Sequence, residues 1–259
     1  MAVFWCAGMY ASGSTWAYNV MRAIAAGEAG RQVRARFANA PTDLAGIGDA
    51  ALSHVIKTHD LPEDAAALLF AAAPRIVVTI RDPRDAVASL MTYQHYPFEL
   101  ALATVVRSAR FATSVAERGE ALLLRYEAGF PDDPATVARI AEAMGMVRDA
   151  AACEAIFKSF RRDAVDRFIG GLESLPQAHH DPRSGDVFDP ETQWHKHHAG
   201  RTGEVGRWRG KLVLGQPAAV EAALADWMEQ YRYEKGPAFG GAFGTGYSVT
   251  LGNVTFDRR

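Results

Sequence analysis

The sequence contains little cysteine, no excess of either charge and no long apolar run, and each shortage excludes a class of protein. Its only cysteines, Cys6 and Cys153, allow at most one disulfide, which excludes a disulfide framework and favours a reducing compartment. Lys and Arg number 28 against 30 Asp and Glu, a net charge of −2, which argues against coating nucleic acid or an anionic membrane. No run approaches the roughly 18 apolar residues that span a bilayer, and residues 1–8 lack a basic signal segment. We expect a soluble cytoplasmic protein that binds any polyanion locally.

Apolar runs alternate with helix-like stretches along the 259 residues, and no internal repeat interrupts them. This alternation predicts an α/β fold with a central parallel sheet flanked by helices. The predicted strands are 2–7, 52–57, 75–80 and 121–125. The predicted helices are 15–26, 63–73, 83–93, 98–117, 134–144, 150–168 and 217–231. We interpret residues 1–235 as a single domain and residues 236–259 as a glycine-rich tail or a hairpin.

A loop of small residues, from Gly8 to Trp16, stands between the first predicted strand and the first predicted helix. Small residues let a backbone wrap around an anion, and free N–H groups at a helix start supply positive potential, so the loop is typical of a phosphate site. A Walker A loop has Gly-Lys-Ser/Thr, whereas Ser14 follows Gly13 here, which disfavours an ordinary ATPase or kinase. The alternative is a tight turn without a ligand.

Arg81 follows the strand expected at 75–80, which delivers it to the carboxyl edge of the sheet. A helix start comes directly after it. Ser89 lies eight residues later, close to two helical turns, so a guanidinium and a hydroxyl can converge on a second phosphate. The alternative is that Arg81 and Arg84 form surface ion pairs with the neighbouring aspartates.

Lys57 and His59 come at the end of another predicted strand, again at the edge where open parallel sheets bind ligands. A histidine there can accept a proton from an attacking hydroxyl near neutral pH. A lysine there can neutralise charge that develops on a transferred group. The alternative is a histidine with a structural role.

Two later segments carry further polar groups. Arg201 and Gly203 open a stretch with several guanidiniums, which suits either bidentate phosphate binding or a basic surface turn. Residues 170–200 are typical of a long loop that covers an active site, and they contain five histidines. These histidines have no cysteine or carboxylate at a recognised zinc spacing, so we predict no metal site and expect them to line or gate a pocket.

The four segments in this order resemble the cytosolic-type sulfotransferases, from about residue 3 to residue 235. That family transfers a sulfuryl group from 3′-phosphoadenosine 5′-phosphosulfate (PAPS) and releases adenosine 3′,5′-bisphosphate (PAP). The resemblance implies a P-loop NTPase-like three-layer fold and transfer to a hydroxyl or amine of a small-molecule acceptor, without a metal. It implies His59 as the general base, because residues 57–59 are similar to the segment that carries the catalytic base of the family. Lys57, in the same segment, is our candidate for the cation beside the transferred group.

The resemblance also implies a 5′-phosphosulfate loop, an adenine pocket and a 3′-phosphate site. Their residues are, in that order, Ser12, Gly13, Ser14 and Thr15; Trp16, Tyr126 and Phe160; and Arg81, Ser89, Arg201 and Gly203.

One position departs from the family, since Ala11 stands where many members have Lys or Arg. A cation there stabilises charge on the departing phosphate, and losing such a group typically costs on the order of 10²–10³ in rate. We expect Lys57 or an arginine from elsewhere to take over. Two alternatives stay open: a PAPS- or PAP-binding protein with weak or no catalysis, and a P-loop kinase acting on a small metabolite. The acceptor and the choice between a monomer and a homodimer stay open too.

Overall fold

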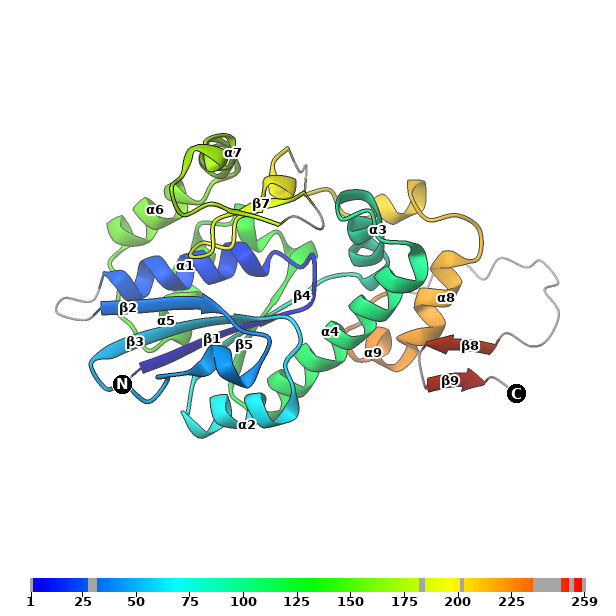
Figure 1. Ribbon diagram of the computed structural model, residues 1–259, viewed down its shortest axis with the longest axis horizontal. Coiled ribbons are helices and arrows are strands. Elements are labelled where there is room, and N and C mark those ends of the chain that lie inside the picture. Colours follow the sequence, from blue (N-terminus) through cyan, green and yellow to red (C-terminus); the bar gives the residue numbers. More distant parts are fainter. Residues whose placement is uncertain are drawn as a thin grey trace.

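The computed structural model describes residues 2–27, 32–181, 185–200, 203–234, 248–251 and 254–257. Its centre is a five-stranded sheet of order β2-β3-β1-β4-β5, in which all pairs are parallel (Figure 1). In chain order the strands are β1 Ala2–Gly8, β2 Gln32–Phe37, β3 Leu52–Thr58, β4 Arg75–Ile80 and β5 Ala121–Arg125. The predicted α/β fold is confirmed. The sequence analysis missed β2 because this edge strand alternates basic residues with apolar ones and forms no apolar run.

The helices follow the predicted pattern, with two exceptions. They are α1 Ser14–Ala26, α2 Glu63–Ala71, α3 Pro83–Tyr93, α4 Phe98–Arg118, α5 Ala135–Ala143, α6 Ala150–Ser159, α7 Arg162–Gly170, α8 Gln216–Ala223 and α9 Ala225–Gln230. The helices predicted at 150–168 and 217–231 are each divided in two. The break at Phe160 frees its carbonyl, which accepts a hydrogen bond from Trp16 Nε1 at 3.0 Å.

Two small antiparallel sheets complete the described chain. β6 (His179–His180) pairs with β7 (Val187–Phe188), and β8 (Ser248–Leu251) pairs with β9 (Val254–Asp257). Within the described ranges, no helix is both long enough and apolar enough to cross a bilayer.

The central sheet buries a separate hydrophobic cluster on each of its faces. Along β1, Trp5 and Ala7 belong to the cluster beneath α2, α3, α4 and α8, whereas Phe4 and Cys6 belong to the cluster beneath α1, α5 and α6. Successive side chains of a strand point to opposite faces, so a strand covered on both sides is apolar throughout. The sheet is therefore the middle of three layers (Figure 1).

The carboxyl ends of β1, β3 and β4 meet where the strand order reverses. β3 lies on one side of β1 and β4 lies on the other. Open parallel sheets bind ligands outside such a switch point. Space is tight there, because a Cβ built on Gly8 at the end of β1 would lie 2.3 Å from Thr79 Oγ1 and 2.7 Å from Ser14 Cβ.

Gly8→Ala should therefore destabilise the protein by about 1–3 kcal/mol, since the added methyl group overpacks the end of β1. Urea unfolding measures the difference. Gly48→Ala is the matched control, because nothing lies within 4 Å of a Cβ built there. Equal free energies of unfolding for the two variants would contradict the close packing at Gly8.

Candidate functional site

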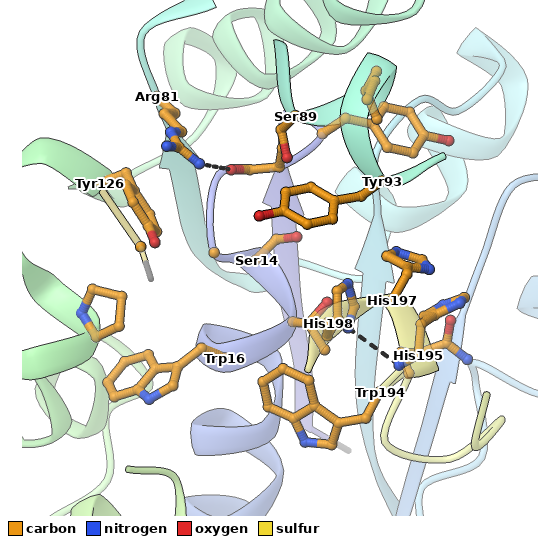
Figure 2. Close-up of a pocket in the computed structure, with 18 of the residues that line it drawn as sticks. Ser14, Trp16, Arg81, Ser89, Tyr93, Tyr126, Trp194, His195, His197 and His198 are labelled. Atoms are coloured by element: carbon orange, nitrogen blue, oxygen red, sulfur yellow. Dashed lines mark hydrogen bonds between the residues drawn. The ribbon is translucent and has the colours of Figure 1, made fainter. Parts of the chain in front are cut away.

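A cavity of about 770 Å³ opens at the carboxyl edge of the sheet (Figure 2). Its volume lies in the range of about 300–1,000 Å³ that is usual for small-molecule sites. The walls bring together most of the residues that the sequence analysis selected. These are Gly13, Ser14, Thr15, Trp16, Lys57, His59, Arg81, Ser89, Tyr126, Phe160 and Gly203.

One selected residue that the structure describes, Ser12, does not line this cavity. The Ser12 hydroxyl lies 2.6 Å from both the Met9 carbonyl oxygen and Thr79 Oγ1, so its side chain fixes the loop and only its backbone remains for a ligand. Arg201 lies outside the described residues.

The cavity concentrates positive charge in a chain that is nearly neutral overall. Its described lining contains Arg36, Lys57, Arg81, Arg162, Arg207 and Lys211, against the carboxylates of Asp85, Asp132 and Glu204. This excess of cations matches the expectation of a local anion site.

Lys57 carries a buried positive charge at the end of β3. Its Nζ donates a hydrogen bond to Thr15 Oγ1 at 2.9 Å, and the residue is 4% exposed. None of the described carboxylates pairs with it, and burial lowers the pKa of Lys57 to about 8. An ammonium with spare N–H groups therefore stands beside the first turn of α1, whose own N–H groups lack helical partners.

His59 is held in the form that a general base requires. Its Nδ1 lies 2.6 Å from the Gly8 carbonyl oxygen, which can only accept, so Nδ1 carries the proton and Nε2 keeps its lone pair. The ring stacks on Tyr10 with centroids 4.1 Å apart. Burial, and then the charge of Lys57, lower the pKa of His59 well below its ordinary value, so the imidazole is neutral at pH 7.

Arg81 links three parts of the site. It donates hydrogen bonds to the Ala11 carbonyl at 3.2 Å and to the Glu204 carbonyl at 3.0 Å, as drawn in part in Figure 2. Its guanidinium lies over the Tyr126 ring, 4.3 Å from the centroid. Nε of Arg81 is buried without a hydrogen-bond partner, which is costly unless a ligand accepts that bond.

Arg84 differs from Arg81 in its surroundings. It is buried, binds Asp82 and Glu221 at 2.7 Å each, and is absent from the cavity wall. The pairing with neighbouring aspartates considered from the sequence is therefore present, for Arg84 with Asp82 and for Arg81 with Asp85 at 3.7 Å, but these pairs are buried and do not lie on the surface. The pair of Arg84 with Glu221 fixes α3 to α8 inside the protein.

Asp85 holds the segment that follows Gly203 against α3. Its carboxylate accepts hydrogen bonds from the backbone N–H of Gly206 at 2.6 Å and of Trp208 at 2.9 Å. Gly203 then lies so close to the site that an added Cβ would be 2.9 Å from both Tyr126 and Arg162. The sequence analysis missed the role of Asp85, because the contact spans more than 120 residues.

Aromatic side chains supply the apolar part of the wall. Trp16, Tyr126 and Phe160 come together as predicted, with the indole of Trp16 bonded to the Phe160 carbonyl. Tyr10 and Phe37 flank His59 and were not selected from the sequence, although Phe37 ends the missed strand β2.

Other aromatic and histidine residues divide between the wall and the rest of the protein. Tyr93 lines the cavity, whereas Tyr96 and Phe98 pack against the core. Of the five loop histidines, the last three line the cavity, as Figure 2 shows, and His179 and His180 are exposed.

Lys57→Met should stabilise the protein at pH 7 by about 1–3 kcal/mol, because it removes a buried charge. The pKa of Lys57 is about 8 in the folded protein and 10.5 for an ordinary lysine. The buried charge therefore destabilises the folded protein fully below pH 8, and this destabilisation vanishes as the pH approaches 10.5. Urea unfolding at pH 7 and pH 10 should show the gain shrinking. Lys57→Arg, which keeps the charge, should show no gain, and a Met variant no more stable than wild type at pH 7 would refute the buried charge.

No protein-family model and no curated protein matches the sequence. Mouse sulfotransferase SULT7A1 complexed with PAP matches with a TM-score of 0.57 and 14% identity, over 88% of this chain and 84% of that chain. Retinol dehydratase in complex with androsterone and the inactive cofactor PAP matches with a TM-score of 0.60 and 18% identity, over 88% of this chain and 80% of that chain. Retinol dehydratase in a complex with retinol and PAP matches with a TM-score of 0.57 and 16% identity, over 88% of this chain and 81% of that chain. The chain therefore has the fold of these PAP-bound proteins.

Proposed function

We propose that the protein transfers a sulfuryl group from PAPS to a hydroxyl or amine of a small-molecule acceptor. The observation that carries the proposal is a pair of buried cations, Lys57 and Arg81, on the strands that flank β1. Strands two places apart in a sheet are about 10 Å apart. Lys57 has N–H groups to spare and Arg81 has an unpaired Nε, so the pair suits a ligand with two separate phosphates. PAPS and PAP are such ligands, with phosphates on the 5′ and 3′ oxygens of one ribose.

The 5′-phosphate of the nucleotide would lie at the start of α1. The backbone N–H groups of residues 12–15 and the helix dipole favour an anion there. Lys57 is fixed beside them by its bond to Thr15. It can therefore compensate negative charge on the sulfuryl group and on the departing phosphate oxygen.

The adenosine end of the nucleotide would occupy the other part of the cavity. Trp16 and Phe160 offer aromatic faces to the adenine, with Tyr126 beside them. Arg81, Ser89 and the Gly203 segment would bind the 3′-phosphate, and Arg201, by its position in the sequence, would add to that site.

His59 would act as the general base. Its Nε2 takes the proton of the acceptor hydroxyl or amine as the acceptor atom bonds to sulfur. The bond between sulfur and the bridging oxygen breaks, and PAP leaves with that oxygen. The one proton that moves in this scheme passes from the acceptor to His59. The rest of the rate enhancement would come from positioning of the reactants and from charge stabilisation.

The acceptor would enter beside His59, between Tyr10 and Phe37. Aromatic walls suit an acceptor with an apolar body and one nucleophilic group. Androsterone and retinol, the molecules bound in the two retinol dehydratase structures, are of that kind.

A second function, holding PAPS or PAP without turnover, is favoured by one observation. Ala11 replaces the loop cation common in the family, and its carbonyl instead accepts a bond from Arg81. Binding and turnover therefore need separate tests. If Lys57 provides the missing charge, Lys57→Ala will abolish turnover, and unchanged turnover would exclude that role.

Arg81→Ala should weaken PAP binding by about 10–100-fold, because hydrogen bonds to charged groups contribute about 1.5–3 kcal/mol. Its affinity for 5′-AMP, which lacks the 3′-phosphate, should stay close to wild type. Titration calorimetry with both nucleotides measures the two effects, and Arg107→Ala removes an exposed arginine as the control. Equal losses for PAP and AMP would contradict the assignment of Arg81 to the 3′-phosphate.

His59→Asn should lower kcat by about 10²–10⁴-fold and leave PAP affinity unchanged. The asparagine amide can still donate to the Gly8 carbonyl, so the variant removes the Nε2 lone pair and little else. Turnover of PAPS is followed by mass spectrometry with the best acceptor from a panel of phenols, alcohols and amines. A variant that retains wild-type kcat would show that another group takes the proton. Wild-type protein that binds PAP but turns over none of the panel would favour the non-catalytic function.

A further inference from the structure

Three side chains converge beside the cavity, and two of them, His195 and His197, line its wall. Asp186 precedes β7, and His195 and His197 lie at the start of the short helical turn Lys196–His198. Nδ1 of His195 lies 2.7 Å from Asp186 Oδ2, and Nδ1 of His197 lies 2.8 Å from the same oxygen. Their ligating atoms all lie within 4.8 Å of one another, which holds for no other group of three His, Cys, Asp or Glu residues in the described chain.

The surrounding chain fixes this cluster in place. β6 and β7 pair as a hairpin, and Phe188 forms a bridge with His195. On the far side, Asn19 Nδ2 donates to the Thr192 carbonyl at 2.7 Å, which fastens the loop to α1. The three side chains are only 17–24% exposed. A site held by backbone pairing and a helix is preorganised for a ligand.

We propose that Asp186, His195 and His197 bind one divalent transition-metal ion, with Zn²⁺ as the reference ion. Imidazole nitrogen suits zinc, copper, iron and nickel, whereas magnesium and calcium take oxygen ligands. Zinc bonds of about 2.0–2.2 Å place tetrahedral ligand atoms about 3.3–3.6 Å apart. Each histidine Nδ1 therefore needs to move less than about 1 Å away from Asp186 Oδ2, and all three ligand atoms already lie within 4.8 Å of one another.

The donor set leaves part of the coordination sphere open. Structural zinc sites have four protein ligands, whereas sites that bind a water or substrate have three. Both histidines line the cavity (Figure 2), so the open position faces the space available to a small molecule. An oxygen or nitrogen atom of that molecule can complete the coordination.

This inference departs from the expectation of no metal. That expectation considered the spacing of the histidines, whereas the fold adds a carboxylate nine residues before His195. The competing arrangement is a hydrogen-bonded cluster in which both histidines donate Nδ1–H to Asp186. A metal ion would bind the Nδ1 lone pair of each neutral ring, whose proton would then be carried on Nε2. A measurement of metal binding to the protein therefore distinguishes the metal site from the hydrogen-bonded cluster.

Equilibrium dialysis of the full chain against ZnCl₂, with elemental analysis, tests the inference without any assay of activity. Wild-type protein should bind one equivalent with a dissociation constant in the micromolar range or tighter. Asp186→Asn and His197→Ala should each weaken binding at least tenfold. His180→Ala, which removes an exposed histidine of the same hairpin, should bind like wild type. Co²⁺ should give visible absorption bands with wild type that both cluster variants lose.

The result on wild type decides the matter even if a cluster variant fails to fold. No saturable binding below about 100 μM would overturn the inference and leave the hydrogen-bonded cluster. Binding that survives in well-folded Asp186→Asn and His197→Ala, judged by circular dichroism, would overturn it too, because the ion would then occupy other groups. The assay contains no nucleotide, so its outcome is distinct from that of the PAP titrations.

Discussion

The ammonium group of Lys57 is buried at the end of β3 beside a threonine hydroxyl, without a carboxylate among the described residues to compensate it. A chain folds this way only when its packing outweighs the penalty, since burying an unpaired charge is unfavourable. The rest of the site is arranged around that charge. The absence of a side chain at Gly8 lets α1 start close to β4, and Thr15 in its first turn meets Lys57. His59, two residues on, is kept neutral in part by the same charge. An anion at this point would relieve the penalty and complete the site.

Arg81 connects this anion site to the segment that closes the cavity. Its guanidinium touches the loop after β1 through Ala11, the far segment through Glu204, and the ring of Tyr126. Asp85, one helical turn on, holds the backbone at residues 206 and 208. Arg81 therefore joins two segments that both line the cavity. This arrangement explains how a chain with a net charge of −2 can present a cationic cavity. Arg36, Lys57 and Arg81 come from the ends of three strands, and Arg162, Arg207 and Lys211 come from later segments.

The sequence predicts those parts of the molecule that depend on local pattern. Four strands were recognisable because each contains a run of mostly apolar residues, including the edge strand β5 with its three leucines. Lys57, His59 and Arg81 were recognisable because each lies at or just after the end of such a strand. β2 was not, because an edge strand with one exposed face carries arginines. The contacts of Asp85 with Gly206 and of Asp186 with two histidines link residues through the fold, and no spacing rule contains them. Local chemistry thus predicts which groups reach the sheet edge, whereas tertiary packing decides which of them meet.

A crystal structure of the wild-type chain with PAP tests the two-cation account most directly. The account predicts the 5′-phosphate at the backbone N–H groups of residues 12–15, with Lys57 in contact, and the 3′-phosphate accepting a hydrogen bond from Nε of Arg81. The adenine should lie between Trp16 and Phe160. A nucleotide bound in the reverse direction, or one whose 3′-phosphate lies away from Arg81, would contradict it.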